Sequence, residues 1–110
     1  MDLNKIIEEL NLEIVAGYNE EMVEVQGVYI CDLLSLVMSK AKSKDIWITI
    51  QSHVNIIAVA TLVELSCIIV AEGMDIDKDT IKKANEVKVP LLKSKLDAYT
   101  LASQLNKLGI

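Results

Sequence analysis

The sequence of 110 residues contains no phenylalanine, and its only aromatic residues are Trp47, Tyr18, Tyr29 and Tyr99. Hydrophobic residues nevertheless make up 52% of the chain, so the core must consist mostly of isoleucine, leucine, valine and alanine. A chain of this length and composition can bury one substantial core. We therefore expect a single domain over residues 1–110.

Glycine, histidine and cysteine are also scarce, which excludes several kinds of site. The four glycines form neither a P-loop nor a GxGxxG motif. One histidine and two cysteines far apart in the sequence do not form a conventional zinc site. We therefore predict no metal and no cofactor. The cysteines, Cys31 and Cys67, are expected to be small core residues of a protein from the reducing cytoplasm.

Basic residues are fewer than acidic ones, 11 against 16, which gives a net charge of -5. Nucleic acids and anionic membranes attract clusters of basic residues, so we expect neither as a partner. The amino-terminal residues lack the apolar stretch of a signal peptide. The longest apolar stretch, residues 56–71, is shorter than the ~20 residues of a membrane-spanning helix. We interpret it as a buried helix followed by a buried strand.

Apolar periodicity predicts alternating strands and helices along most of the chain. The expected helices cover residues 3–10, 32–42, 54–65, 77–87 and 94–108, and the expected strands cover residues 12–16, 28–30, 46–50, 66–71 and 89–92. From Ile46 onward, the β-α-β-α-β-α order favours parallel strands joined by right-handed crossovers. We therefore predict an α/β domain with a mostly parallel sheet of about four to five strands and flanking helices.

The helix expected over residues 54–65 is apolar around almost its whole circumference, so it must be covered on more than one side. One sector of this helix contains Ile57, Ala60, Thr61 and Glu64. Either a neighbouring helix of the same chain or a second copy of the protein would cover what the sheet leaves open. Because symmetric dimers are the commonest oligomers, we predict a homodimer with these four residues as candidate interface residues.

The stretch ITIQSHVN, residues 48–55, gathers polar side chains where a strand changes into a helix. A structural interpretation makes Ser52 the N-cap of the helix, with Asn55 at the position that completes a capping box. A functional interpretation makes Gln51, Ser52, His53 and Asn55 a binding site for a small anion or a nucleotide phosphate. Parallel sheets bind ligands beyond the carboxyl ends of their strands, and helix N-termini attract anions. A third interpretation is a polar cluster at a protein interface.

No arrangement of residues in the sequence indicates catalysis. A Ser-His-Asp triad would need His53 as its base, and the side chain of its neighbour Ser52 would point away from it. The one enzyme hypothesis that we retain uses Asp32 and His53 as acid and base, which requires these two side chains to lie close together. We predict no catalytic residues and no enzymatic activity.

Three stretches resemble the DRTGG domain family: YICDLLSLVM, DIWITIQSHVNIIAVATL and VPLLKSKLDAYTLASQLNKLGI. The resemblance runs in order from about Leu3 to Ile110. The motif that names the family is retained only at Gly27. Its Asp-Arg pair falls at Met22-Val23, and its threonine and second glycine fall at Gln26 and Val28.

The resemblance implies an α/β module similar to the amino-terminal domain of HPr kinase. DRTGG domains occur with CBS domains, with phosphotransacetylases, in some inorganic pyrophosphatases and as stand-alone proteins. The family therefore implies a non-catalytic regulatory module that forms homodimers and acts through a protein partner. The alternative is a sensor of small anions or nucleotides at the Gln51-Asn55 junction. The retained Gly27 joins Gln51, Ser52, His53 and Asn55 as a candidate ligand-binding residue.

Overall fold

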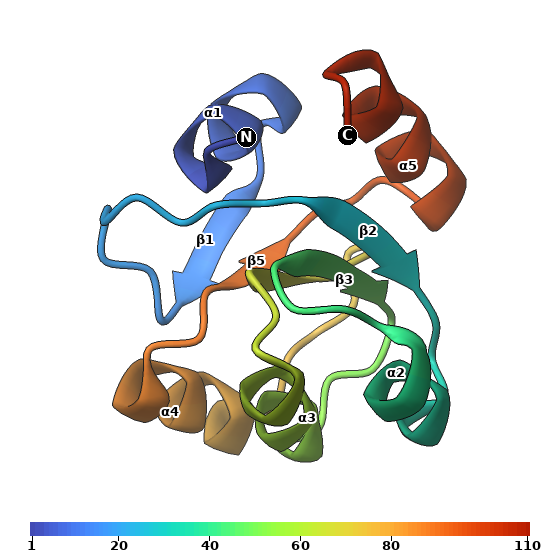
Figure 1. Cartoon of the computed structure of the whole chain (residues 1–110). Helices are drawn as coiled ribbons and strands as arrows, with labels where there is room; N and C mark the ends of the chain where they lie inside the picture. The colour runs from blue at the N-terminus through green and yellow to red at the C-terminus, as the bar shows by residue number, and fades with distance from the viewer.

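A five-stranded sheet lies between two layers of helices (Figure 1) in the computed structural model, which describes residues 1–110. The helices are α1 (Leu3–Leu10), α2 (Leu34–Lys40), α3 (Asn55–Val63), α4 (Lys78–Val87) and α5 (Ala98–Lys107). The strands are β1 (Glu13–Ala16), β2 (Gly27–Ile30), β3 (Asp45–Thr49), β4 (Cys67–Val70) and β5 (Leu91–Lys93). The prediction of an α/β domain with a mostly parallel sheet is confirmed.

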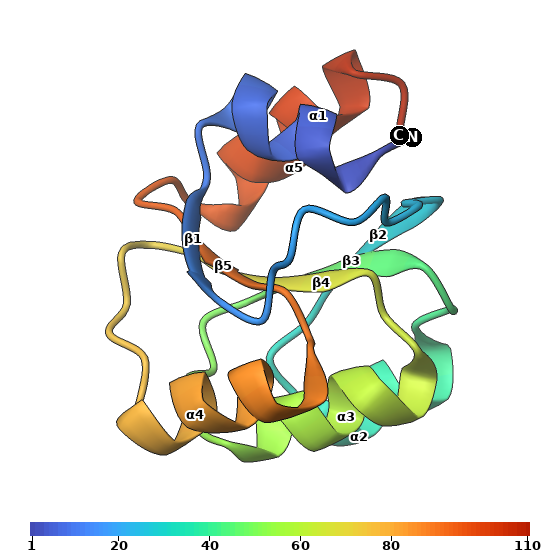
Figure 2. The ribbon, with the colours of Figure 1, turned by 90° about the vertical axis from the view of Figure 1, so that its left-hand side faces the viewer.

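The strands follow the order β1-β5-β4-β3-β2 across the sheet. Strands β2 to β5 are parallel to one another, whereas β1 pairs antiparallel with β5 at one edge. Helices α2, α3 and α4 connect the parallel strands and cover one face of the sheet, while α1 and α5 cover the other (Figure 2). The helices that follow the parallel strands therefore change from one face of the sheet to the other once, immediately after β5.

Each face of the sheet has its own hydrophobic core, because successive residues of the central strands point to opposite faces. Ile46 and Ile48 of β3 belong to the core beneath α1 and α5, and Trp47 belongs to the core beneath α2, α3 and α4. All three are completely buried. The indole Nε1 of Trp47 donates a hydrogen bond of 2.8 Å to the carbonyl oxygen of Cys31. This two-sided burial explains why the central strands are apolar at every position.

The longest apolar stretch of the sequence divides as expected between the buried parts of α3 and β4. None of the helices combines the length and the apolar character that crossing a membrane requires.

The loop after β5 delays the start of the last helix. The hydroxyl oxygen of Ser94 accepts a hydrogen bond from the amide of Leu96, within the loop. Asp97 is the N-cap of α5, and its carboxylate accepts a hydrogen bond of 2.8 Å from the amide of Thr100. The helix therefore begins at Ala98 rather than at residue 94, because a turn that Ser94 stabilises locally competes with the helix.

Candidate functional site

At the junction after β3, the side chain of Gln51 is already hydrogen-bonded to another part of the chain. The Nε2 atom of Gln51 donates a hydrogen bond of 2.9 Å to the carbonyl oxygen of Asp32. The carboxylate of Asp32 accepts hydrogen bonds from the hydroxyl of Thr49, at 2.8 Å, and from the amide of Ile50, at 3.0 Å. Gln51 and Asp32 thus join the loops that follow β2 and β3.

Ser52 does not cap α3, so the predicted capping box is wrong. The N-cap is Val54, and no side chain caps this end of the helix. The carbonyl oxygen of Ser52 instead accepts hydrogen bonds from the amide of Asp77, at 3.3 Å, and from the hydroxyl of Thr80, at 2.7 Å. The Ser52 backbone therefore ties the start of α3 to the start of α4.

His53 lies beside a carboxylate, but not the one that the enzyme hypothesis required. Its Nδ1 atom is 2.8 Å from Oδ2 of Asp77, and both side chains are exposed. Asp32 is hydrogen-bonded to other groups. The structure therefore pairs His53 with the N-cap residue of α4, and Asn55 is exposed at the first position of α3.

Gly27 does not join the other candidate ligand-binding residues. It is the first residue of β2 and pairs with Asp45 at the amino end of β3, whereas Gln51 follows the carboxyl end of β3. The structure therefore does not bring Gly27 together with the other four residues. A Cβ atom on Gly27 would lie 2.7 Å from Oδ1 of Asp45. A larger residue there would require the Asp45 carboxylate to move, and the φ angle of Gly27 is not positive.

The four candidate interface residues fall into two groups. Ile57 and Ala60 are buried against the sheet, with 0% and 1% of their surfaces exposed, respectively. Thr61 is exposed and donates a hydrogen bond of 2.9 Å to the carbonyl oxygen of Ile57. Glu64 is exposed beyond the last turn of α3, in a left-handed conformation. Ile57 and Ala60 are thus core residues of a single chain, so other residues form the outer surface of α3.

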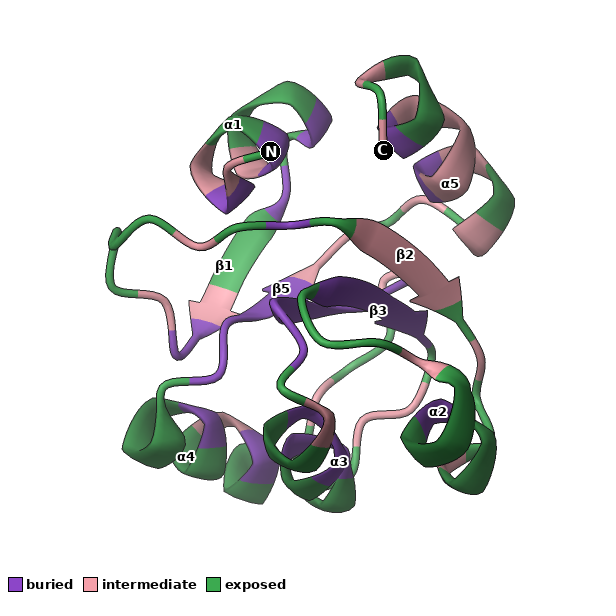
Figure 3. Cartoon of the chain, in the orientation of Figure 1, coloured by how far each residue is buried: buried purple, intermediate pink, exposed green.

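The outer surface of α3 is apolar and continues onto α2. Neither helix contains an acidic residue, and Lys40 is their one charged residue. We use the name α2–α3 surface for the exposed apolar residues on and beside these helices. They are Leu33 (58% exposed), Leu36, Met38, Val54 (43%), Ala58 and Leu62 (71%). Figure 3 shows the exposed outer sides of both helices. The missing charges were visible in the sequence, but the direction in which each residue points was not.

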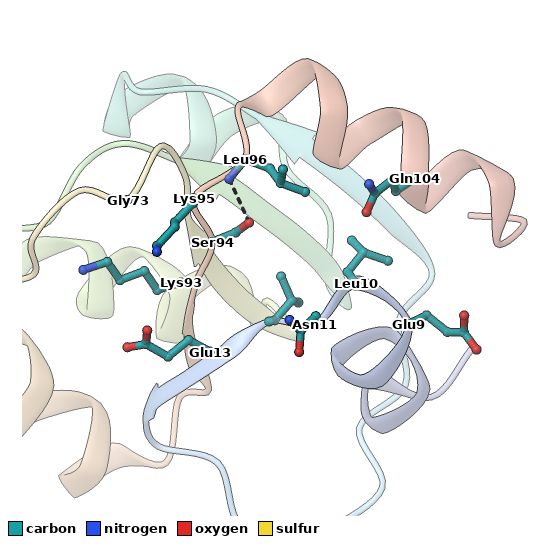
Figure 4. A pocket seen from close by; sticks show the side chains of 11 residues that line it. Glu9, Leu10, Asn11, Glu13, Gly73, Lys93, Ser94, Lys95, Leu96 and Gln104 are labelled. Atoms are coloured by element: carbon teal, nitrogen blue, oxygen red, sulfur yellow. Dashed lines mark hydrogen bonds between the residues drawn. The ribbon is translucent and has the colours of Figure 1, made fainter.

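A pocket of about 760 Å³ opens beyond the carboxyl ends of β4 and β5 (Figure 4). Gly73, in the loop after β4, lies on one side, together with Lys93 at the end of β5 and the three residues that follow it. The corner between α1 and β1 and the side chain of Gln104 from α5 complete the wall. Sequence reasoning missed this pocket because it chose the strand end after β3.

Neither cysteine forms a disulfide bond. Cys67 is completely buried in β4, and burial raises the pKa of its thiol, so it is not a reactive group. Cys31 is half-buried, and its Sγ atom lies 3.4 Å from the amide nitrogen of Leu33, which donates to it. No three histidine, cysteine or acidic side chains are grouped so that they could hold a metal ion.

Residues 5–108 match the sequence model of the DRTGG domain. The chain belongs to the DRTGG domain family. No curated protein matches the sequence significantly. One similar solved structure is the crystal structure of the CBS and DRTGG domains of the regulatory region of Clostridium perfringens pyrophosphatase, complexed with the activator diadenosine tetraphosphate.

The pyrophosphatase fragment shares 18% sequence identity with this DRTGG domain, and the two superimpose with a TM-score of 0.74. The match covers 94% of this chain but only 45% of the other. The DRTGG domain described by residues 1–110 therefore spans less than half of that fragment. At this level of identity the similarity establishes the shared fold.

The positions of the family motif lie at the amino ends of the strands in this DRTGG domain. Met22 is 81% exposed in the loop before β2. The side chain of Gln26 donates a hydrogen bond to the carbonyl oxygen of Ser43, and Gly27 begins β2. The junction after β3 and the pocket beyond β5 lie at the carboxyl ends of the parallel strands. The motif positions therefore contribute to neither of them.

Proposed function

We propose that this DRTGG domain is a non-catalytic regulatory module that forms a homodimer and acts through a protein partner. Family membership supports the regulatory part, because the DRTGG domain of the Clostridium perfringens pyrophosphatase belongs to that protein's regulatory region. The α2–α3 surface is the observation that carries the proposal of self-association. The partner would be a separate protein or a further domain.

The argument for self-association depends on charge as well as on exposure. One exposed leucine such as Leu62 is ordinary on a soluble protein. Several exposed apolar residues on two adjacent helices that carry one charge between them are less ordinary. An uncharged surface is best covered by another uncharged surface, and a second copy supplies one through a two-fold axis. Each chain has a net charge of -5, and a contact through these two helices brings together no acidic residue of either helix.

Sedimentation equilibrium over a wide concentration range tests the homodimer directly. We expect Leu62→Glu to shift the protein toward the monomer by at least tenfold in dissociation constant, because a buried unpaired charge opposes association. Tyr99→Glu is the matched control, since Tyr99 is 84% exposed on α5, on the other side of the sheet. A monomeric wild-type protein at every concentration would contradict the proposal. Equal effects of the two substitutions would place the interface elsewhere.

A second candidate function is the sensing of a small anion or nucleotide at the Gln51-Asn55 junction. The absence of a side-chain cap on α3 supports it, because the amide of Asn55 at the start of the helix has no partner and can bind an anion. Ser52 is partly exposed and Asn55 is exposed, so both can contribute to such a site. The diadenosine tetraphosphate in the pyrophosphatase fragment makes nucleotides a sensible first class of ligand.

Melting temperature against a panel of nucleotides and phosphates tests this second function. A ligand that binds only the native state raises the melting temperature by mass action. We expect Ser52→Ala to reduce the shift, whereas Ser103→Ala on α5 should not change it. If no compound in the panel raises the melting temperature, the junction is not a sensor for these compounds.

A further inference from the structure

The pocket beyond β5 lies at the one place where two neighbouring parallel strands, β4 and β5, are followed by helices on opposite faces of the sheet. The loop after β4 leads to α4, and the loop after β5 leads to α5 on the other face (Figure 2). Loops that diverge in this way leave a crevice at the carboxyl end of an open sheet, and this is where such folds bind ligands. At the end of β3 no such crevice is expected, because α2, α3 and α4 all cover the same face.

The pocket has two chemically different ends. Figure 4 shows Lys93 and Lys95 near Gly73 at one end, and Glu9 and Gln104 at the other. Both amino groups therefore lie at one end, together with the carboxylate of Glu13, and the carboxylate of Glu9 lies at the other end. Its apolar lining consists of Leu10, Leu12 and Leu96.

The two lysines are not equivalent. The Nζ atom of Lys93 lies 3.8 Å from Oδ1 of Asp75, and Glu13 is its neighbour across the β1–β5 pair. Carboxylates therefore already balance the charge of Lys93. Lys95 is exposed and forms no ion pair within the chain. It supplies the one uncompensated positive charge on the wall of the pocket.

We propose that this pocket binds an organic phosphate whose remaining part carries hydroxyl groups, as in a sugar phosphate or a nucleotide. The phosphate lies beside Lys95, with Lys93 close to it, because an ammonium group attracts a phosphate oxyanion. The hydroxyl groups lie toward Glu9 and Gln104, because a carboxylate accepts hydrogen bonds from hydroxyls and an amide both donates and accepts them. The leucines contact the carbon skeleton.

The carboxylates restrict the ligand class further. Glu9 would repel a second anionic group placed at the far end of the pocket, whereas Glu13 lies beside Lys93. A ligand with one phosphate at one end is therefore preferred over a polyanion that is charged along its whole length. Inorganic phosphate alone would leave most of the 760 Å³ unfilled.

Isothermal titration calorimetry with AMP, ribose 5-phosphate and inorganic phosphate tests the proposal on the whole chain. We expect one or both organic phosphates to bind at least tenfold more tightly than inorganic phosphate. Lys95→Ala should weaken that binding about tenfold, the size of one charged hydrogen bond. Lys82→Ala is the matched control, because Lys82 is exposed on α4, beyond the opposite face of the sheet.

The choice of ligands and a second variant distinguish a nucleotide from a sugar phosphate as the bound compound. Binding of AMP alone identifies a nucleotide, and equal binding of AMP and ribose 5-phosphate identifies the sugar phosphate as the recognised part. Glu9→Gln should weaken both organic phosphates but not inorganic phosphate. The proposal is overturned if neither organic phosphate binds, if Lys95→Ala binds as tightly as wild type, or if inorganic phosphate binds equally well. Loss of binding in Ser52→Ala with no change in Lys95→Ala would assign the ligand to the β3 junction instead.

Discussion

Helices α3 and α4 lie side by side on the same face of the sheet, and each follows a buried parallel strand. Their inner surfaces are both buried, through Ile56 and Ile57 in α3 and through Thr80 and Ala84 in α4. Their outer surfaces differ completely. That of α4 carries all of its charged residues, namely Lys78, Asp79, Lys82, Lys83 and Glu86, whereas α3 has none.

This difference shows which of the apolar residues of α3 are required for folding. Helix α3 lies between α2 and α4 and contacts both, so large apolar residues are needed on its inner side and its flanks. Helices α2 and α4 therefore bury part of the apolar surface of α3 that the sheet leaves open. They do not cover Leu62 or Val54, which remain 71% and 43% exposed. Folding alone does not require these residues to be apolar, because α4 folds on the same sheet with lysines on its outer side.

The largest expected effect comes from disrupting β4, a strand of the sheet on which both helices pack, through a side chain in the core beneath α1 and α5. Ile69 lies in β4, between β3 and β5, and is completely buried. Ile69→Asp would bury an unpaired carboxylate and should cost about 4 kcal/mol or more, a large part of the stability of a small domain. Circular dichroism during urea denaturation measures the loss. Native-like stability of this variant would show that the placement of β4 is wrong.

A smaller effect compares the inner surfaces of the two helices. Ile57→Ala on α3 should lower the free energy of unfolding by about 3 kcal/mol, because it leaves a cavity in the core. Ile81→Ala on α4 should cost about 1 kcal/mol, since Ile81 is only half-buried and can be replaced partly by water. Urea denaturation of both variants gives the ratio of the two losses in free energy of unfolding. Equal losses would mean that α4 packs as tightly as α3.

The smallest effect concerns the starts of helices. Asp97→Ala removes the N-cap of α5 and should lower the melting temperature by a few degrees. Ser52→Ala should change it very little, because α3 has no side-chain cap to lose. Differential scanning calorimetry of the two variants compares the helix starts. If Ser52→Ala destabilised the protein as much as Asp97→Ala, the structure of the α3 start would be wrong.

The contribution of Asp97 should also depend on pH in a defined direction. Hydrogen bonds from the hydroxyl and the amide of Thr100 hold the pKa of its carboxyl below the ordinary value of 3.8. A lowered pKa in the folded state stabilises the protein above the ordinary pKa. This stabilisation is lost as the pH falls through the lowered value. The difference in melting temperature between wild type and Asp97→Ala should therefore narrow below pH 3.8. A difference that widened there would contradict the assignment of Asp97 as a charged cap.

The secondary structure was predictable because it depends on local patterns. The apolar periodicity around Leu3 and the continuous apolar strand around Ile68 are properties of neighbouring residues, and both predicted elements are present. The capping box at Ser52 failed because the β3–α3 loop instead uses the Ser52 carbonyl to bind α4, through Asp77 and Thr80. Those contacts join residues more than twenty positions apart, and no local pattern contains them.

The sequence by itself determined the fold class and the family. It also showed that histidine, cysteine and glycine, which metal sites and phosphate-binding loops need, are scarce. These depend on residue types, on their spacing and on the alternation of strands and helices. Only the tertiary structure decided which residues of a given helix face outward, because that depends on the neighbours that α2 and α4 provide. It also decided where the strand connections diverge. The chain changes face after β5, and this topology brings Lys95 near Gly73 and Glu9 to the opposite end of one pocket.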